Sequence, residues 1–472
     1  MKNRRIIVIA TLGISCLMSL SLILTAQEPA VEKSADLPTV FSPESADKTV
    51  IEETLRTVKA RNTGTGSCSA VACHGGVGRK SCEDSAMGIW RSEYTVWMTD
   101  DRHSRAYEVL HQPLATKIAE NLAAGSEVIP AWKDLRCLAC HSTPRSKREF
   151  EATVQLNADG VGCESCHGPA QNWLTEHTTN RWQSIDSETR QRDYQFTNTK
   201  NLEIRTRMCV GCHLGRRDDG DLVDRDMNHD MIAAGHPRLN FEMSAYSDLM
   251  PKHWCENREE SPSPNADQNE NDQLRPLRLW LTGVKVMAEE GLALSASRCG
   301  DENVPWPEFS ELNCQKCHHD LTADMPRLRD ARQESLNWGS WFLGPWVNPE
   351  LEPLFPNKQA IEKTKPLRDL MNGPWPDRQK FLLLIKPLLT EEKMASGPVA
   401  SGLPADRERI EKVLDTLLKT PFDSFGKDWE AESQAYLLLF SLYQSGFDEG
   451  RRELLRQRLD LIRQRLSKEP LE

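Results

Sequence analysis

Hydrophobic residues recur at helical spacing along the chain, and no stretch of any length alternates apolar with polar residues. Side chains three and four positions apart share one face of a helix, so this period predicts amphipathic helices. The predicted helices cover residues 277–294, 410–418, 435–443 and 455–466, with Gly446 as the stop of the third. The fold class that we expect is therefore mainly α and rich in loops.

The longest apolar run lies at the start of the chain. Three basic residues among the first five precede a hydrophobic stretch at 6–24, the pattern of a secretory signal peptide, here residues 1–26. An uncleaved membrane anchor is the alternative, because the run is nearly long enough to span a bilayer. Cys16 does not favour a lipoprotein, since the apolar run continues past it. No later segment is apolar enough to be transmembrane, so we expect an exported, periplasmic protein.

Five short motifs combine two cysteines with a histidine directly after the second. They are Cys68, Cys73 and His74; Cys137, Cys140 and His141; Cys163, Cys166 and His167; Cys209, Cys212 and His213; Cys314, Cys317 and His318. Four of them have the Cys-x-x-Cys-His spacing that attaches a c-type haem. The thiols add across the two porphyrin vinyl groups, and the histidine becomes the proximal iron ligand. The first motif has four intervening residues, a spacing also seen in tetrahaem cytochromes of the c3 type.

Zinc knuckles are the alternative use of cysteines and histidines at such spacings. Those sites need four ligands clustered in pairs, whereas here every cysteine pair has its own adjacent histidine. The sequence therefore predicts five covalently bound haem c groups. Such large apolar discs would supply core that a chain with only 38% hydrophobic residues lacks.

Histidines outside the motifs are candidates for the second, distal iron ligand. All twelve histidines lie between residues 74 and 319, which indicates that several complete bis-histidine, low-spin haems. The distal candidates are His103, His177, His229, His236 and His319. His111 and His253 have no comparable sequence context, and we interpret both as surface residues.

Local sequence supports each candidate differently. We expect His103 to follow a helix start capped by Thr99 or Asp100. His177 comes ten residues after the third motif, near enough for a short helix to fold over a haem. A Gly-His-Pro turn orients His236, for which His229 is the reserve. His319 directly follows a proximal histidine, as in c3-type cytochromes, where the second histidine reaches a neighbouring haem.

Cys82, Cys255 and Cys299 lie outside both the motifs and the signal. A disulfide between Cys255 and Cys299 would leave Cys82 free, although the sequence does not exclude another pairing. We expect structural roles for all three.

The expected domain organisation follows the motifs. After the signal, residues 27–63 are a polar, flexible linker. Residues 64–325 form a pentahaem cytochrome c domain organised by its haems, interrupted by an acidic loop at 256–273. Residues 326–472 contain neither cysteine nor histidine, so we expect a haem-free helical C-terminal domain. Its aromatic cluster of Trp338, Trp341, Phe342 and Trp346 is interpreted as a packing joint.

The chain is acidic, which bears on its partners. Its formal net charge of −11 becomes −14 when Lys2, Arg4 and Arg5 leave with the signal. This charge argues against nucleic acid as a partner. It favours basic or membrane-anchored redox proteins.

The order of motifs resembles the cytochrome c-554 family of multihaem cytochromes. The resemblance covers roughly residues 64–245 and rests on the second and third motifs, on His177 and on the segment around His103. It implies an open coordination site at the second haem of the chain, the one on His141. The sequence departs from the tetrahaem pattern in its fifth motif and in the long spacing of its first.

Two function classes follow. The first is an electron carrier that passes single electrons between redox partners through its haems, and we favour this class. The second is an oxidoreductase that acts on nitrite, hydroxylamine or nitric oxide at one open haem. The sequence contains no Cys-x-x-Cys-Lys motif of the kind found in pentahaem nitrite reductases, and no catalytic residue can be named.

Overall fold

The computed structural model describes residues 60–77, 90–217, 222–256, 273–312, 318, 358–373, 375–390, 407–419 and 429–466. Several expectations lie outside these residues: the signal peptide, most of the linker and of the acidic loop, the aromatic cluster, Cys82, Cys314, Cys317 and His319. No helix in the described part has both the length and the apolar character needed to cross a membrane.

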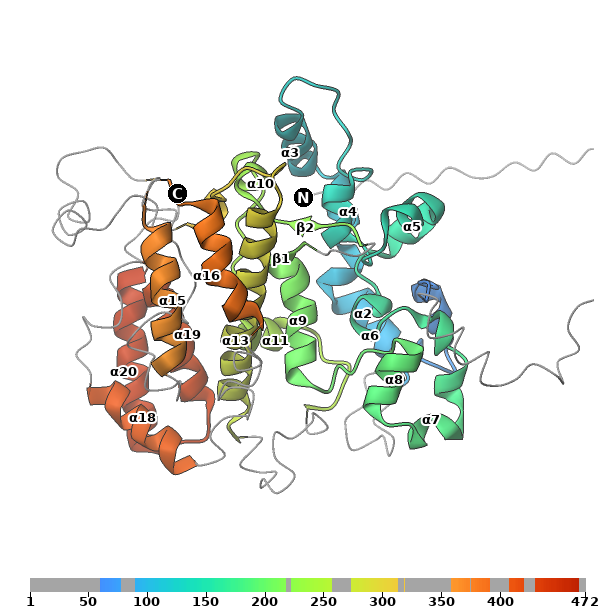
Figure 1. Ribbon diagram of the computed structural model, residues 1–472. Helices are drawn as coiled ribbons and strands as arrows, with labels where there is room; N and C mark the ends of the chain where they lie inside the picture. Colours follow the sequence, from blue (N-terminus) through green and yellow to red (C-terminus); the bar gives the residue numbers. More distant parts are fainter. Residues whose placement is uncertain are drawn as a thin grey trace, which may run out of the picture. The chain divides into compact units, whose positions relative to one another are not determined.

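The described part of the chain is mainly helical and rich in loops, which confirms the expected fold class (Figure 1). Its α-helices are α2 (Glu93–Asp100), α3 (Pro113–Ala123), α4 (Leu135–His141), α5 (Lys147–Ala152), α6 (Cys163–His167), α7 (Asn180–Ser184), α8 (Ser187–Tyr194), α9 (Leu202–His213), α10 (His229–Ala233), α11 (Met243–Leu249), α13 (Arg275–Gly300), α15 (Lys358–Met371), α16 (Arg378–Thr390), α18 (Arg407–Lys419), α19 (Trp429–Gln444) and α20 (Glu449–Leu466).

Short 3₁₀ helices and one small sheet complete the described elements. The 3₁₀ helices are η1 (Thr65–Cys68), η3 (Arg102–Arg105), η4 (Glu108–His111), η5 (Val154–Asp159), η6 (Ala170–Asn172), η7 (Glu176–Thr178) and η9 (Phe309–Glu311). The sheet pairs β1 (Gly215–Arg216) antiparallel with β2 (Arg225–Asp226). Each strand has two residues, in keeping with the lack of alternating patterns in the sequence.

Polar side chains cap several of the short helices, among them α4 and α9, which carry motifs. Asn201 accepts hydrogen bonds from the backbone N–H groups of Glu203 and Ile204, which caps α9. Ser146 and Glu149 form a reciprocal capping box at the start of α5. Such caps matter here because helices of five to twelve residues are too short to be stable on propensity alone.

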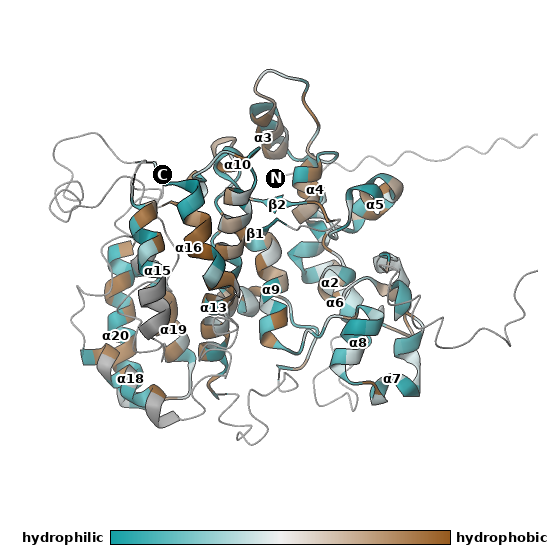
Figure 2. Ribbon diagram, in the orientation of Figure 1, coloured by the Kyte–Doolittle hydropathy of each residue, from teal (hydrophilic) through white to brown (hydrophobic). Residues whose placement is uncertain are grey.

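The four helices predicted from hydrophobic periodicity are confirmed as α13, α18, α19 and α20. Hydrophobic and hydrophilic positions are interleaved along α19 and α20 in Figure 2. The structure adds α15 and α16, which the sequence pattern did not single out. The domain boundary expected at residue 325 stays a prediction.

Helix α13 supplies the main core. One set of its side chains packs with α18, α19 and α20, in a cluster of Leu277, Trp280, Leu281, Val284, Ile410, Leu414, Leu438, Leu442, Leu455 and Ile462. Leu279 and Val286 of the same helix pack instead with Val210 of α9 and with Phe241 and Met243 beside α11. Helix α13 therefore contacts both the motif-bearing helix α9 and the C-terminal helices.

The approach of α13 to α11 is close enough to need a glycine. A Cβ on Gly283 would lie 2.7 Å from the Cβ of Met243. A larger residue at position 283 would therefore push the two helices apart.

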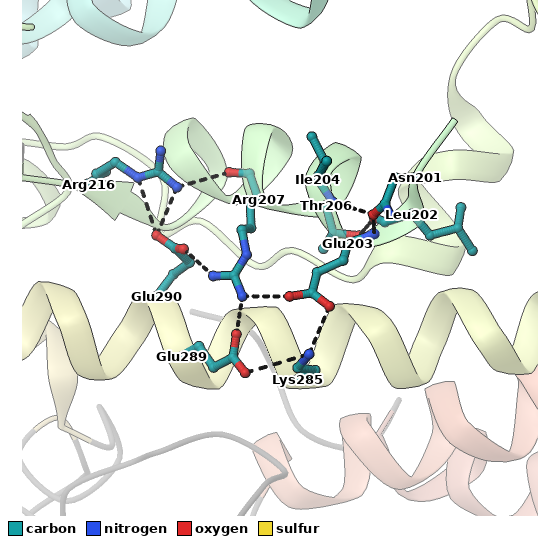
Figure 3. A network of polar contacts seen from close by, with 10 residues as sticks. All are labelled: Asn201, Leu202, Glu203, Ile204, Thr206, Arg207, Arg216, Lys285, Glu289 and Glu290. Atoms are coloured by element: carbon teal, nitrogen blue, oxygen red, sulfur yellow. Dashed lines mark hydrogen bonds and ion pairs between the residues drawn. The ribbon is translucent and has the colours of Figure 1, made fainter. Parts of the chain in front are cut away.

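Ion pairs join α9 to α13 (Figure 3). Arg207 of α9 pairs with Glu289 and Glu290 of α13, the latter at 2.7 Å. Lys285, which is 1% exposed, places its Nζ 2.8 Å from Glu203 of α9. These contacts hold the helix that ends in the fourth motif against the longest helix of the described chain.

Candidate functional site

Three motifs stand at the ends of α-helices. Helices α4, α6 and α9 each end at the motif histidine: His141, His167 and His213. In a helix, residues three and four positions apart share one face. Both cysteines and the histidine of each motif are therefore presented on the same side of their helix, as attachment of one flat group requires.

The first motif has a different local structure. Helix η1 ends at Cys68, and turns follow up to His74, where the Cys73 N–H donates to the Ala70 carbonyl at 2.8 Å. Five positions separate Cys68 from Cys73, so a regular helix would not place them on one face. The turns take the place of the helix that the second, third and fourth motifs use.

The eight described motif cysteines are free thiols, as attachment of haem requires. Thiols of different motifs lie close enough to shift each other's pKa: Cys68 with Cys163, and Cys140 with Cys212. The first motif therefore lies beside the third, and the second beside the fourth.

Four motif histidines each have another histidine ring at the same distance. The ring centroids are 6.3 Å apart in the pairs His74–His177, His103–His213, His141–His236 and His229–His318. In every pair one histidine belongs to a motif and the other does not. The two residues of each pair are roughly a hundred positions apart in the chain.

This spacing fits a metal ion between two imidazoles. Two bonds of about 2 Å from one iron to the facing nitrogens put the ring centres about 6.3 Å apart. Direct hydrogen bonding would instead bring the two facing nitrogens to about 3 Å. Two bonds of about 2 Å to one iron hold those nitrogens about 4 Å apart, as these ring distances require. The residues present therefore fit haem iron with two axial histidines.

Hydrogen bonds orient the paired rings. In five of the rings, Nδ1 lies within hydrogen-bond distance of an oxygen that is an acceptor and not a donor. These oxygens belong to Glu93 for His74 (3.0 Å), Asp101 for His103 (2.9 Å), the Ala106 carbonyl for His141 (2.9 Å), the Trp173 carbonyl for His177 (3.2 Å) and the Pro237 carbonyl for His236 (2.9 Å). Nδ1 must therefore carry the proton in each ring. Nε2 is left with its lone pair, the form that binds iron.

The surroundings shift the pKa values of these histidines in two directions. Hydrogen bonding to Glu93 raises the pKa of His74, and hydrogen bonding to Asp101 raises that of His103. Burial lowers the pKa of His167 to about 4 and that of His213 to about 4. The last two rings are therefore neutral at pH 7, as an iron ligand must be.

His167 differs from the other motif histidines. Among the described residues, no imidazole stands 6.3 Å from its ring. Its neighbour is Phe196, with ring centroids 6.0 Å apart. The family resemblance implied that His141 would lack a second histidine, but the ring of His236 faces His141.

The structure places the distal candidates in varied local elements. His103 lies in η3, whose cap is Asp101; the expected caps Thr99 and Asp100 are wrong, since both belong to α2. His177 lies in η7. His229 begins α10, and His236 follows Gly235, whose φ is +110°. His229 and His236 face different partners, so one is no substitute for the other.

Two other expectations concern residues outside the pairs. Cys299 is a free, buried thiol, whereas Cys255 is disulfide-bonded, so the proposed disulfide between them is wrong. His111 is exposed and stacks on Trp132 with ring centroids 4.8 Å apart, which fits the surface role expected for it. The interpretation of His253 as a surface residue is wrong, because its Nδ1 is buried.

Sequence reasoning missed Glu93 and Asp101, the carboxylates that orient His74 and His103. Asp101 stands two residues before His103, a spacing that could have indicated it. Glu93 is separated from His74 by residues with no regular pattern, and no sequence signal connects the two.

Comparison with known proteins found one similarity. The family described as cytochrome c554 and c-prime matches residues 67–168, which contain the first three motifs. This match supports a cytochrome c554-like c-type cytochrome with covalently bound haem c that works in electron transfer. Neither the curated proteins nor the solved structures yielded a match.

Proposed function

We propose that this chain, cytochrome c554-like over residues 67–168, is an exported pentahaem c-type cytochrome that transfers single electrons between redox partners. The observation that carries the proposal is the spacing of 6.3 Å in four histidine pairs, each with one motif histidine. Four repeats of one metal-compatible distance are hard to reconcile with unrelated packing.

The residues that would hold the haems are those of the five motifs. The covalent attachments are Cys68, Cys73, Cys137, Cys140, Cys163, Cys166, Cys209, Cys212, Cys314 and Cys317, and the proximal ligands are His74, His141, His167, His213 and His318. The distal ligands are His177, His103, His236 and His229 for the first, fourth, second and fifth haem. Bound haem supplies an iron that accepts and releases one electron.

The contacts between motifs favour relay within the protein. The thiols of Cys68 and Cys163, and those of Cys140 and Cys212, lie close enough to shift each other's pKa, so residues of the first and third motifs and of the second and fourth are neighbours. Cys166 also interacts electrostatically with Cys209 and Cys212, which connects the third motif to the fourth. The chain thereby links four motifs in the spatial order first, third, fourth, second.

Two axial histidines make each of the four paired sites suited to electron transfer. With both axial positions filled by protein, the iron needs no exchange of ligands when it changes oxidation state. An accessible end of the relay fits this role, since Cys73 of the first motif is exposed. The acidic charge of the chain suits a basic or membrane-anchored redox partner in the periplasm.

An oxidoreductase of small nitrogen compounds is the second candidate. It is favoured by one observation, namely that His167 has no facing imidazole among the described residues. Catalysis would also need acids or bases beside the iron.

The test of the main proposal is the haem content and its spin state. The mass of the denatured, purified protein should exceed that of the mature polypeptide by five haem groups. The ferric EPR spectrum should contain low-spin signals from four haems. A mass increase of four haems or fewer, or fewer than four low-spin haems, would contradict the proposal.

Turnover separates the two candidate functions. Nitrite, hydroxylamine and nitric oxide should each be converted slowly or not at all when a chemical electron donor or acceptor is supplied. Turnover at enzyme-like rates, typically about 1–1,000 s⁻¹, would favour the oxidoreductase instead.

A further inference from the structure

A buried arginine lies between the second and fourth motifs. Arg225 belongs to β2, which contacts α4 of the second motif and pairs with β1, the strand that follows α9 and the fourth motif. Its Nη1 lies 3.7 Å from the sulfur of Cys212. Only 7% of the residue is exposed. The guanidinium therefore stands inside the protein, at the junction of two haem attachment sites.

The fourth motif leaves room for this side chain. Gly211, the residue before Cys212, lies against the guanidinium, and an added Cβ would stand 3.1 Å from Nη1 of Arg225. A side chain at this variable position of the motif would press on the guanidinium. The glycine therefore lets the positive charge come close to the attachment site.

No carboxylate neutralises Arg225 within the described structure. Its buried Nε has no hydrogen-bond partner, and Nη1 contacts a sulfur, which is a weak acceptor. The adjacent Asp226 is paired with Arg217 and Arg298 instead. Successive residues of a strand point to opposite faces, which separates the two side chains. Because arginine stays protonated in proteins, an uncompensated positive charge remains at this place.

This charge acts on the sulfurs of both motifs. It lowers the pKa of Cys212, beside the larger effect of the neighbouring Cys140 thiol. It acts in the same direction on the pKa of Cys140, where the Cys212 thiol and burial outweigh it. Reduction adds one electron to a haem. A cation at its edge therefore stabilises the reduced form and raises the reduction potential.

The first haem has the opposite environment. The carboxylate of Glu93 accepts the hydrogen bond from Nδ1 of His74 at 3.0 Å, which strengthens donation to iron and stabilises the ferric form. At the second haem, uncharged backbone carbonyls accept the corresponding hydrogen bonds from His141 and His236. The two ends of the relay thus differ in the sign of the nearest charge.

We propose that Arg225 makes the second haem the electron-collecting end of the relay, so that electrons move from the first haem towards it. The fourth haem, whose His103 is hydrogen-bonded to the carboxylate of Asp101, has a potential between those of the first and the second. This inference rests on the proposed function and adds a direction to it. The exposed Cys73 of the first motif then marks the side of the electron donor.

The order of potentials is tested in the wild-type protein by a redox titration followed by EPR. Interplanar angles of 12° for His74–His177 and 75° for His141–His236 give the first and second haems different low-spin signals. His177→Ala and His236→Ala assign them, since each should remove one signal. On reduction, the signal of the second haem should disappear at a higher potential than that of the first. The reverse order would overturn the inference.

Variants at position 225 test the arginine itself. Arg225→Met removes the charge at similar volume, so the equilibrium constants for reduction of the second and fourth haems should fall about tenfold, a shift of about 59 mV. Arg225→Lys keeps the charge and should retain most of the potential. Arg456→Met makes the same substitution at an exposed arginine paired with Glu453 and should change no potential. Unchanged potentials in Arg225→Met, or equal losses in the methionine and lysine variants, would refute the role of the charge.

Haem content keeps the two levels of the argument apart. A wild-type mass with fewer than five haems contradicts the proposed function. Five haems and native circular dichroism in Arg225→Met, with unchanged potentials, contradict only the role of Arg225. If Arg225→Met does not fold, Arg225→Gln replaces it as the uncharged variant, and the wild-type titration still decides the direction of the relay.

Discussion

Glu93 Oε2 lies 3.0 Å from Nδ1 of His74 and accepts the hydrogen bond from that nitrogen. The acceptor is a carboxylate rather than a backbone carbonyl. The pKa of Glu93 is lowered: burial acts to raise it, and the hydrogen bonds from His74 and from the Trp90 N–H more than offset that effect. The carboxylate is therefore ionised at neutral pH. A carboxylate with a full negative charge, as the acceptor of Nδ1–H, makes the imidazole a stronger donor to iron than a carbonyl acceptor does.

Replacing this carboxylate should change one reduction potential. Glu93→Gln keeps an oxygen acceptor for Nδ1–H but removes the charge, so the ferric state of the first haem loses stabilisation. We expect its reduction potential to rise by roughly tens of millivolts, measured by potentiometric titration. Glu120→Gln, at an exposed glutamate paired with Lys117, should leave all potentials unchanged. Equal shifts in the two variants would contradict the assignment.

The ring angles of the pairs should be visible in EPR. The interplanar angle is 83° for His103–His213 but 12° for His74–His177. Near-perpendicular axial imidazoles give strongly anisotropic low-spin signals, and near-parallel ones give rhombic signals. His103→Ala should remove a strongly anisotropic signal and add a high-spin one. His111→Ala should leave every signal in place, since that ring packs on Trp132. Loss of a rhombic signal in His103→Ala would assign this histidine to another haem.

The ion pairs between α9 and α13 should contribute to stability. Arg207→Met leaves Glu289 and Glu290, which are 10% and 13% exposed, without this guanidinium. We expect a loss of about 2 kcal/mol in the free energy of unfolding, measured by denaturant titration followed by circular dichroism. Arg456→Met removes an exposed pair with Glu453 and should cost at most about 1 kcal/mol. A smaller effect for Arg207→Met would show that the network is marginal.

Gly168 directly follows the third motif and allows the chain to pass close by. Its φ is +81°, and an added Cβ would lie 2.2 Å from the Gln195 carbonyl oxygen. Gly168→Ala should therefore cost about 1–3 kcal/mol and displace the segment that brings Phe196 onto His167. In Gly300→Ala, the added Cβ meets nothing within 4 Å, and stability should stay level or rise slightly. Thermal unfolding of the two variants makes the comparison; equal melting temperatures would contradict it.

The sequence was informative where chemistry and periodicity are local. Four helices followed from hydrophobic spacing, and the c-type haem attachment sites followed from residues within five or seven positions of one another. His103, His177, His229 and His236 were also singled out from their context, and the structure gives each of them a facing motif histidine. Their role as iron ligands remains a prediction.

The partner of each histidine was beyond the sequence. His229 and His236 are seven positions apart and seemed to compete for one site, yet they face His318 and His141. Only the tertiary fold decides this, because α10 and the Gly235 turn redirect the chain between them. The pairing of Cys255 and Cys299 failed for a similar reason, since two thiols 44 positions apart carry no information on the direction of their side chains.

Each of these histidine pairs joins a motif to a residue near a different motif, and this has a consequence for how the protein is assembled. His74 belongs to the first motif but faces His177, which follows the third; His213 belongs to the fourth but faces His103, which precedes the second. If the chain is exported with its N-terminus first, as proposed, it presents the first attachment site long before the ring that would complete it. We expect the early haems to pass through a stage with one axial histidine, open to adventitious ligands. The site of His74 would then close when His177 docks, and the sites of His141 and His213 only later, when α9 and the segment after it dock.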